Sequence, residues 1–114
     1  MKLSESYCQK YDVHPSKLAA LDYCWWHINN LVARAKLTAG LDENAHGKIS
    51  MWIALGQLPQ WRLDRLTELD RWGDGAWMTY YSLKARVLAG EDIELPETLP
   101  PCPVTFAQLL FEND

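Results

Sequence analysis

The fold class of this chain is set by residues 15–40, PSKLAALDYCWWHINNLVARAKLTAG. Apolar side chains recur in this stretch at alternating intervals of three and four residues, the period of one face of an α-helix. They are Leu18, Leu21, Trp25, Ile28, Val32 and Ala35. Pro15 suits a first helical turn, and Gly40 suits a left-handed residue after the last turn. The pattern predicts a long helix over about residues 15–39 whose apolar face packs against neighbours.

Three further main helices are predicted downstream. The first covers about residues 44–56 and ends before Pro59, because proline disfavours a helical residue ahead of it. The next begins at Pro59 and closes at Gly73-Asp74-Gly75, and the last covers about residues 76–89. No segment alternates like a strand. The prediction is an all-α, compact bundle of four main helices with a short N-terminal helix.

The end of the chain differs in charge from the rest. Residues 91–114 hold six acidic side chains and no Lys or Arg, whereas residues 1–90 hold nine acids and all eleven bases. The tail is also rich in proline and ends in an apolar patch. We therefore predict a helical domain over residues 1–90 and an acidic tail over 91–114 that packs on this domain or on a partner and ends in a helical turn. Because the body is nearly neutral, a DNA-mimicking surface is not supported.

Composition limits the class of protein. The chain has 114 residues, 48% of them apolar and 23% charged, as expected for one soluble globular domain. No apolar run reaches the roughly 18–20 residues that span a bilayer. The N-terminus, MKLSES, turns polar at once, unlike a secretion signal. An odd number of cysteines, three, then favours free thiols in a reducing cytoplasm.

One segment resembles a DNA-binding motif. Residues 5–18, ESYCQKYDVHPSKL, are similar to helix-turn-helix segments of bacterial regulators, with Cys8 at the small-residue position and Asp12 at the turn. The resemblance implies that His14, Ser16 and Lys17 read DNA. Residues 1–22 are electrically balanced, however, and the alanines that follow offer no hydrogen bonds to base edges. The sequence favours a structural helical corner over DNA binding.

Metal and catalytic sites are weakly indicated. Cys24 and His27 have ligand-like spacing, and Cys8 and His14 lie upstream, but no paired cysteines accompany them. Cys24 is better interpreted as a buried thiol. Tyr80 and Lys84 have the Tyr-x-x-x-Lys spacing of short-chain dehydrogenases, without the glycine fingerprint that such enzymes need. We expect no catalytic residue, no cofactor and no metal.

Six tryptophans are the compositional anomaly of the chain. Helical spacing places Trp25 and Trp52 inside the protein. Trp26 points away from the predicted face, and exposed tryptophans are favoured at interfaces. The remaining tryptophans either seal one end of the core or form a docking surface. The candidate partner-binding tryptophans are Trp26, Trp61, Trp72 and Trp77.

The tail contributes the other candidate binding residues. Gln108-Leu-Leu-Phe111 looks like a truncated form of the glutamine-leucine-aromatic motif with which bacterial proteins bind the sliding clamp. The alternative is a helical turn that packs back on the body, and the sequence favours this alternative. The residues concerned are Phe106, Leu109, Leu110 and Phe111.

These observations predict a small cytoplasmic protein that acts by protein–protein interaction, as a bacterial or phage-type regulator or inhibitor. An inhibitor of a host nucleic-acid machine, in the manner of anti-CRISPR proteins, fits this description, and so do many adaptors. The alternative is a helix-turn-helix transcriptional regulator. The partner is expected to be another protein, nucleic acid is less favoured, no membrane is involved, and the predicted helical face could pair within the chain or across a homodimer.

Overall fold

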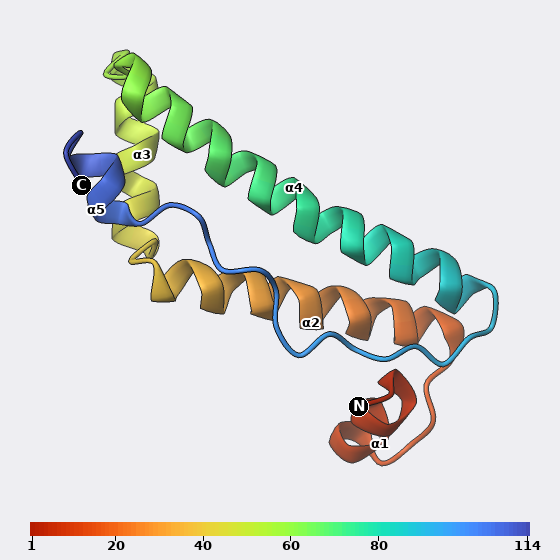
Figure 1. Cartoon of the computed structure of the whole chain (residues 1–114). Helices are drawn as coiled ribbons and strands as arrows, with labels where there is room; N and C mark the ends of the chain where they lie inside the picture. Colours follow the sequence, from red (N-terminus) through yellow and green to blue (C-terminus); the bar gives the residue numbers. More distant parts are fainter. The chain divides into compact units, whose positions relative to one another are not determined.

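The computed structural model describes all residues from 1 to 114 and contains five helices and no strand (Figure 1). The helices are α1 (Leu3–Tyr11), α2 (Lys17–Thr38), α3 (Glu43–Leu55), α4 (Gln60–Leu88) and α5 (Phe106–Leu110). The predicted all-α class is therefore confirmed, as are the short N-terminal helix and the helical turn near the end of the tail.

Contacts divide the chain into two units. Unit 1 comprises Met1–Val32 and Gly75–Leu99, and unit 2 comprises Ala33–Asp74 and Pro100–Asp114. The helices α2 and α4 each contribute residues to both units, and so does the tail.

In unit 1 the first half of the tail returns along α2 (Figure 1). Ile93 is fully buried and Leu95 is 6% exposed, so this extended segment is part of the core. Helix α1 contributes Leu3 to the same core. The buried side chains of α2 and α4 in this unit are Ala20, Tyr23, Cys24, Ile28, Leu31, Val32, Ala76, Tyr80, Leu83 and Val87.

In unit 2 the end of the tail packs on α3 (Figure 1). The Trp52 ring stacks on Phe106 with ring centroids 6.2 Å apart. A capping box at Thr105 and Gln108 starts α5, which has only five residues and needs such support. The buried core residues of this unit are Leu41, Ala45, Trp52, Val104 and Leu109.

The prediction of four main helices is wrong, because α4 runs unbroken from Gln60 to Leu88. Gly73 and Gly75 were expected to end one helix and start another. Neither glycine has a positive φ, and no proline interrupts the helical hydrogen bonds. A helical glycine costs only about 1 kcal/mol relative to alanine. Buried contacts on both sides of the glycines offset this cost, with Leu69 packed in unit 2 and Ala76 in unit 1.

The predicted apolar face of α2 is only partly correct. Ile28 and Val32 are buried, but Leu18 is 71% exposed and Trp25 is 46% exposed. Trp25 was expected inside the protein, and this expectation is wrong. The buried side of α2 instead includes Ala20, Tyr23 and Cys24. These residues belong to a second set of apolar side chains on the helix, and this set forms the core of unit 1. Trp52, the other tryptophan predicted to be internal, is 4% exposed.

None of the helices combines the length and apolar character needed to cross a membrane.

Candidate functional site

A set of exposed apolar side chains in unit 1 lies on α2 and α4. We call it the α2–α4 face and define it by five residues: Leu18, Trp25, Trp77, Tyr81 and Leu88. Helical spacing groups them, because Leu18 and Trp25 are seven residues apart and Trp77, Tyr81 and Leu88 are separated by four and seven. Tyr81 is 62% exposed and Leu88 is 51% exposed, whereas Trp77 is half-buried.

Contacts at both ends bring the two helices side by side along this face. The Trp25 and Trp77 rings stack with centroids 5.9 Å apart. At the other end, Lys17 Nζ donates to the Leu88 carbonyl oxygen at 3.3 Å, which brings the start of α2 beside the end of α4. The result is an aromatic and aliphatic surface shared by two helices that run in opposite directions.

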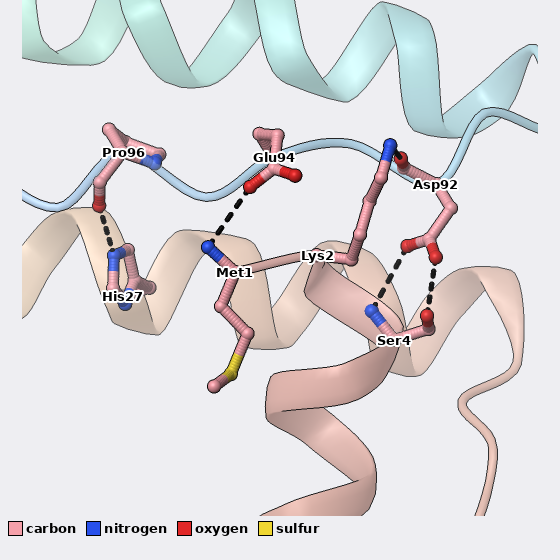
Figure 2. Close-up of polar contacts among 7 residues, drawn as sticks. All are labelled: Met1, Lys2, Ser4, His27, Asp92, Glu94 and Pro96. Atoms are coloured by element: carbon pink, nitrogen blue, oxygen red, sulfur yellow. Dashed lines mark hydrogen bonds and ion pairs between the residues drawn. The ribbon is translucent and has the colours of Figure 1, made fainter.

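Other sides of α2 in unit 1 are covered by the tail and the N-terminus. The Leu3 amide donates to the Ile93 carbonyl at 2.8 Å, and the Leu95 amide donates to the Met1 carbonyl at 3.1 Å. His27 Nε2 on α2 donates to the Pro96 carbonyl at 2.6 Å (Figure 2). The tail is thus attached to both α1 and α2, and the α2–α4 face is left open.

Acidic side chains of the tail anchor it to the chain's N-terminus, in an arrangement that we call the N-terminal clasp (Figure 2). The Met1 amino group lies 3.0 Å from Glu94 Oε2. Asp92 accepts hydrogen bonds from the Ser4 amide, at 3.0 Å, and from the Ser4 hydroxyl. Lys2, the residue before α1, provides no capping side chain, so Asp92 satisfies this helix end from 88 residues away.

The clasp changes the ionisation of its members. The hydrogen bonds from Ser4, first from its hydroxyl and then from its amide, lower the pKa of Asp92. The hydrogen bond to Glu94 raises the pKa of the Met1 amino group; burial opposes this shift, and the charges of nearby glutamates add to it. Both shifts favour the charged forms, so the clasp is held by ionised groups at neutral pH.

The three residues predicted to read DNA lie together but are already engaged. Lys17 donates to Leu88, and the Ser16 hydroxyl accepts from the Ala19 amide at the start of α2. His14 Nδ1 is 3.6 Å from Cys8 Sγ. All three line a cavity of about 390 Å³ with two acids of the tail, Glu91 and Asp92. Asp12 does adopt the predicted left-handed turn, with φ 59°.

The predicted partner-binding tryptophans have separate surroundings. Trp77 belongs to the α2–α4 face of unit 1. In unit 2, Trp61 is half-buried beside the guanidinium groups of Arg62 and Arg65, at 5.0 and 5.1 Å from its centroid. Trp72 Nε1 donates to the Pro100 carbonyl at 2.8 Å and so fixes the tail. Trp61 and Trp72 therefore have contacts inside unit 2 that account for their positions.

The tail residues proposed to bind a partner differ in exposure. Leu109 is fully buried, Phe106 and Leu110 are half-buried, and Phe111 is 58% exposed. Gln108, the first residue of the clamp-like motif, is used in the capping box. Of the apolar residues in this set, Phe111 has the greatest accessible area.

The cysteines and histidines considered as metal ligands lie in different environments. Cys24 is fully buried, as predicted, and burial raises the pKa of its thiol to about 11. His27 is bonded to Pro96. No group of three or more His, Cys, Asp and Glu side chains is arranged to hold a metal ion.

Sequence reasoning missed a second aromatic site. Trp26, 41% exposed, lies with three tyrosines at the junction of α1 and α2 in a recess of about 270 Å³. The tyrosines are Tyr7, Tyr11 and Tyr23. The spacing of Tyr7 and Tyr11, four residues apart on a short helix, was the available signal, because it places both rings on one face.

No family model matches this chain, and no curated protein or solved structure shows a significant match to it. Its function must therefore be argued from the geometry described above.

Proposed function

We propose that this protein acts by binding another protein through the α2–α4 face. The supporting observation is that Leu18, Trp25 and Tyr81 remain between 46% and 71% exposed on two helices whose Trp25 and Trp77 rings stack on each other. Single exposed apolar residues are common, but a contiguous patch indicates an interaction site. Tyr and Trp are also the residues most enriched among those that dominate binding energy.

The size of the face favours a separate partner over a permanent homodimer. A fully open aromatic side chain presents about 150–250 Å² and a leucine less, so five roughly half-exposed side chains offer at most on the order of 500 Å². This suits the apolar centre of a standard interface of about 800 Å² per partner, whereas obligate dimers bury about 1,000 Å² or more per protomer. We expect the partner to present an amphipathic helix, because the apolar side of such a helix can pack on the exposed side chains of α2 and α4.

We propose further that this binding regulates or inhibits the partner, as a bacterial or phage-type regulator does. A small protein with a rigid aromatic surface can occupy an apolar site on a larger machine and exclude its normal ligand. A host nucleic-acid machine is one such target within this proposal.

The test uses capture from a bacterial lysate by the immobilised chain, followed by affinity measurement with the purified captured protein. Tyr81→Glu and Leu18→Glu should each weaken the affinity at least about 30-fold, since hot-spot losses are about 2 kcal/mol or more. Leu55→Glu is the matched control, because Leu55 is 62% exposed on α3 in unit 2. It should leave the affinity unchanged.

Two results would overturn the proposal. One is the failure to capture any protein whose affinity is weakened by Tyr81→Glu and Leu18→Glu. The other is sedimentation showing a homodimer that these two variants dissociate, because the occupant of the face would then be a second copy of the chain.

The DNA-binding alternative has less support. Unit 1 carries seven acidic side chains against five Lys and Arg, and two of the acids line the cavity that contains His14, Ser16 and Lys17. Phosphate neutralisation supplies most of the affinity for DNA, and this charge balance opposes it. A salt-dependent mobility shift with mixed DNA that is lost in Lys17→Glu would favour this alternative.

A further inference from the structure

The recess at the junction of α1 and α2 is lined mainly by aromatic rings. The Tyr23 ring is 5.5 Å from Tyr7, 6.3 Å from Tyr11 and 5.4 Å from Trp26, measured between centroids. Tyr23 meets both other tyrosines at nearly right angles, at 81° and 79°. Ala19 and Asp22 of α2 complete the lining. Such an arrangement directs several π-faces and edges toward one small volume.

A cation of the chain itself already lies against these rings. The Lys10 ammonium is 3.6 Å from the Trp26 centroid, 5.5 Å from that of Tyr11 and 6.0 Å from that of Tyr23. Lys10 forms no ion pair, so the aromatic rings are its electrostatic partners. Distances within about 6 Å are those of favourable cation–π interactions. The site therefore has a negative electrostatic potential, which attracts a positively charged group.

The charge and polarity of the lining indicate the kind of cation. Asp22 places one carboxylate in the wall and forms no ion pair of its own. The Tyr23 hydroxyl is already hydrogen-bonded to Ser6 Oγ, at 2.7 Å. A methylated ammonium needs no hydrogen-bond acceptor, so the aromatic faces and the negative charge of Asp22 are sufficient to hold it. The recess, at about 270 Å³, is also below the usual size of a site for a drug-sized ligand, and this suits a small head group.

We propose that this recess binds a quaternary ammonium group, which displaces the Lys10 side chain from the Trp26 ring. Lys10 acts as an internal competitor, so the affinity for the external cation is reduced by the fraction of molecules in which Lys10 occupies the rings. The site is independent of the α2–α4 face and of the protein partner proposed for that face.

The test is a titration of the intact chain with choline, followed through the NMR resonance of the Trp26 indole N–H. The neutral isostere 3,3-dimethylbutan-1-ol, at the same ionic strength, separates charge from shape. Choline should shift the resonance saturably, and the neutral alcohol should bind about 10-fold more weakly, since a cation–π gain near 1.4 kcal/mol corresponds to that factor.

Variants sharpen this test. Lys10→Met should tighten choline binding several-fold by removing the competitor, and Lys48→Met, a change at an exposed lysine of unit 2, should leave it unaltered. Trp26→Leu should weaken binding at least about 10-fold; binding in this variant is followed by calorimetry, and its fold is checked by circular dichroism. Equal binding of choline and the neutral alcohol, or no choline binding by either the wild-type chain or Lys10→Met, would overturn the proposal.

Discussion

Unit 2 and unit 1 each hold one half of the tail, and in both the tail supplies hydrogen-bond acceptors, but only in unit 1 are its carboxylates among them. In unit 2 the tail offers main-chain carbonyls to arginines: Arg62 Nε donates to Leu109 at 2.9 Å, and Arg65 donates to Gln108, Phe111 and Glu112. In unit 1 the tail's own carboxylates accept from the N-terminus. Arginine and carbonyl groups keep their charge state at all ordinary pH values, whereas carboxylates titrate. The two attachments should therefore respond differently to acid.

The largest expected effect tests the apolar attachment in unit 2. Leu109 is fully buried among Trp52 and Val104, so Leu109→Ala leaves a cavity as well as losing apolar contact. We expect the free energy of unfolding to fall by about 2–5 kcal/mol in chemical denaturation. Phe111→Ala is the control, and it should change stability by less than about 0.5 kcal/mol, because Phe111 is largely exposed. Equal losses in the two variants would show that the end of the tail is not anchored by Leu109.

The next effect tests the arginine contacts. Arg65→Met keeps the aliphatic stem but removes the donors to three carbonyls near the end of α5. The free energy of unfolding should fall by about 1.5 kcal/mol. This is the lower end for hydrogen bonds to a charged group, and it is expected here because Phe111 and Glu112 are exposed. Arg71→Met, at an exposed position on α4, serves as the comparison. Hydrogen exchange at the α5 amides should accelerate in Arg65→Met and stay unchanged in Arg71→Met.

A smaller effect tests the N-terminal clasp. Asp92→Ala removes the acceptor for the Ser4 amide. It should lower the free energy of unfolding by about 1 kcal/mol, the usual value for a lost helix cap. Glu97→Ala, an exposed tail position, should cost little. Increased hydrogen exchange of the first α1 amides in Asp92→Ala, without change at α5, would confirm that the two attachments are separate.

The pH dependence follows from the same carboxylate. Because the folded pKa of Asp92 lies below its unfolded value, its contribution to stability is present above about pH 4 and is lost as pH falls through the folded pKa. Acid should loosen residues 92–95 before the α5 segment. Asp92→Asn, which keeps an acceptor but does not titrate, should reduce this acid dependence. A pH profile of α1 exchange that is identical in Asp92→Asn and the wild-type chain would contradict this account.

The smallest effect concerns the glycines of α4 that lie on either side of the unit boundary. A Cβ at Gly73 or Gly75 meets no atom within 4 Å, and both residues are helical. Gly73→Ala and Gly75→Ala should each stabilise the protein by about 0.5–1 kcal/mol in thermal denaturation. Gly90→Ala should destabilise it, since Gly90 has φ +92°. Destabilisation by Gly73→Ala or Gly75→Ala would mean that α4 is interrupted at that glycine.

Part of the candidate site was accessible from sequence. Trp26 and Trp77 were identified as surface candidates, and both lie at exposed or half-exposed aromatic sites. Tyr81 and Leu88 could not be distinguished from core residues by sequence, because their spacing of seven matches that of the buried Tyr80 and Val87. The spacing of apolar residues shows that they share one side of a helix. It does not show which of two adjacent residues is buried in the core and which is exposed at the surface. The N-terminal clasp left no signal, since Ser4 and Asp92 are joined only by folding.

The sequence by itself determined which segments are helical and where several of the helices end. Gly40, Gly56 and Gly90 all adopt the left-handed conformation that follows a helix, and Thr105 starts α5, because these are local properties of a few consecutive residues. The tertiary structure decided which side of α2 is buried and whether α4 continues through its glycines. Both outcomes depend on contacts between segments far apart in the chain. Those contacts contribute more free energy than the helix propensities of individual residues, which differ by about 1 kcal/mol or less.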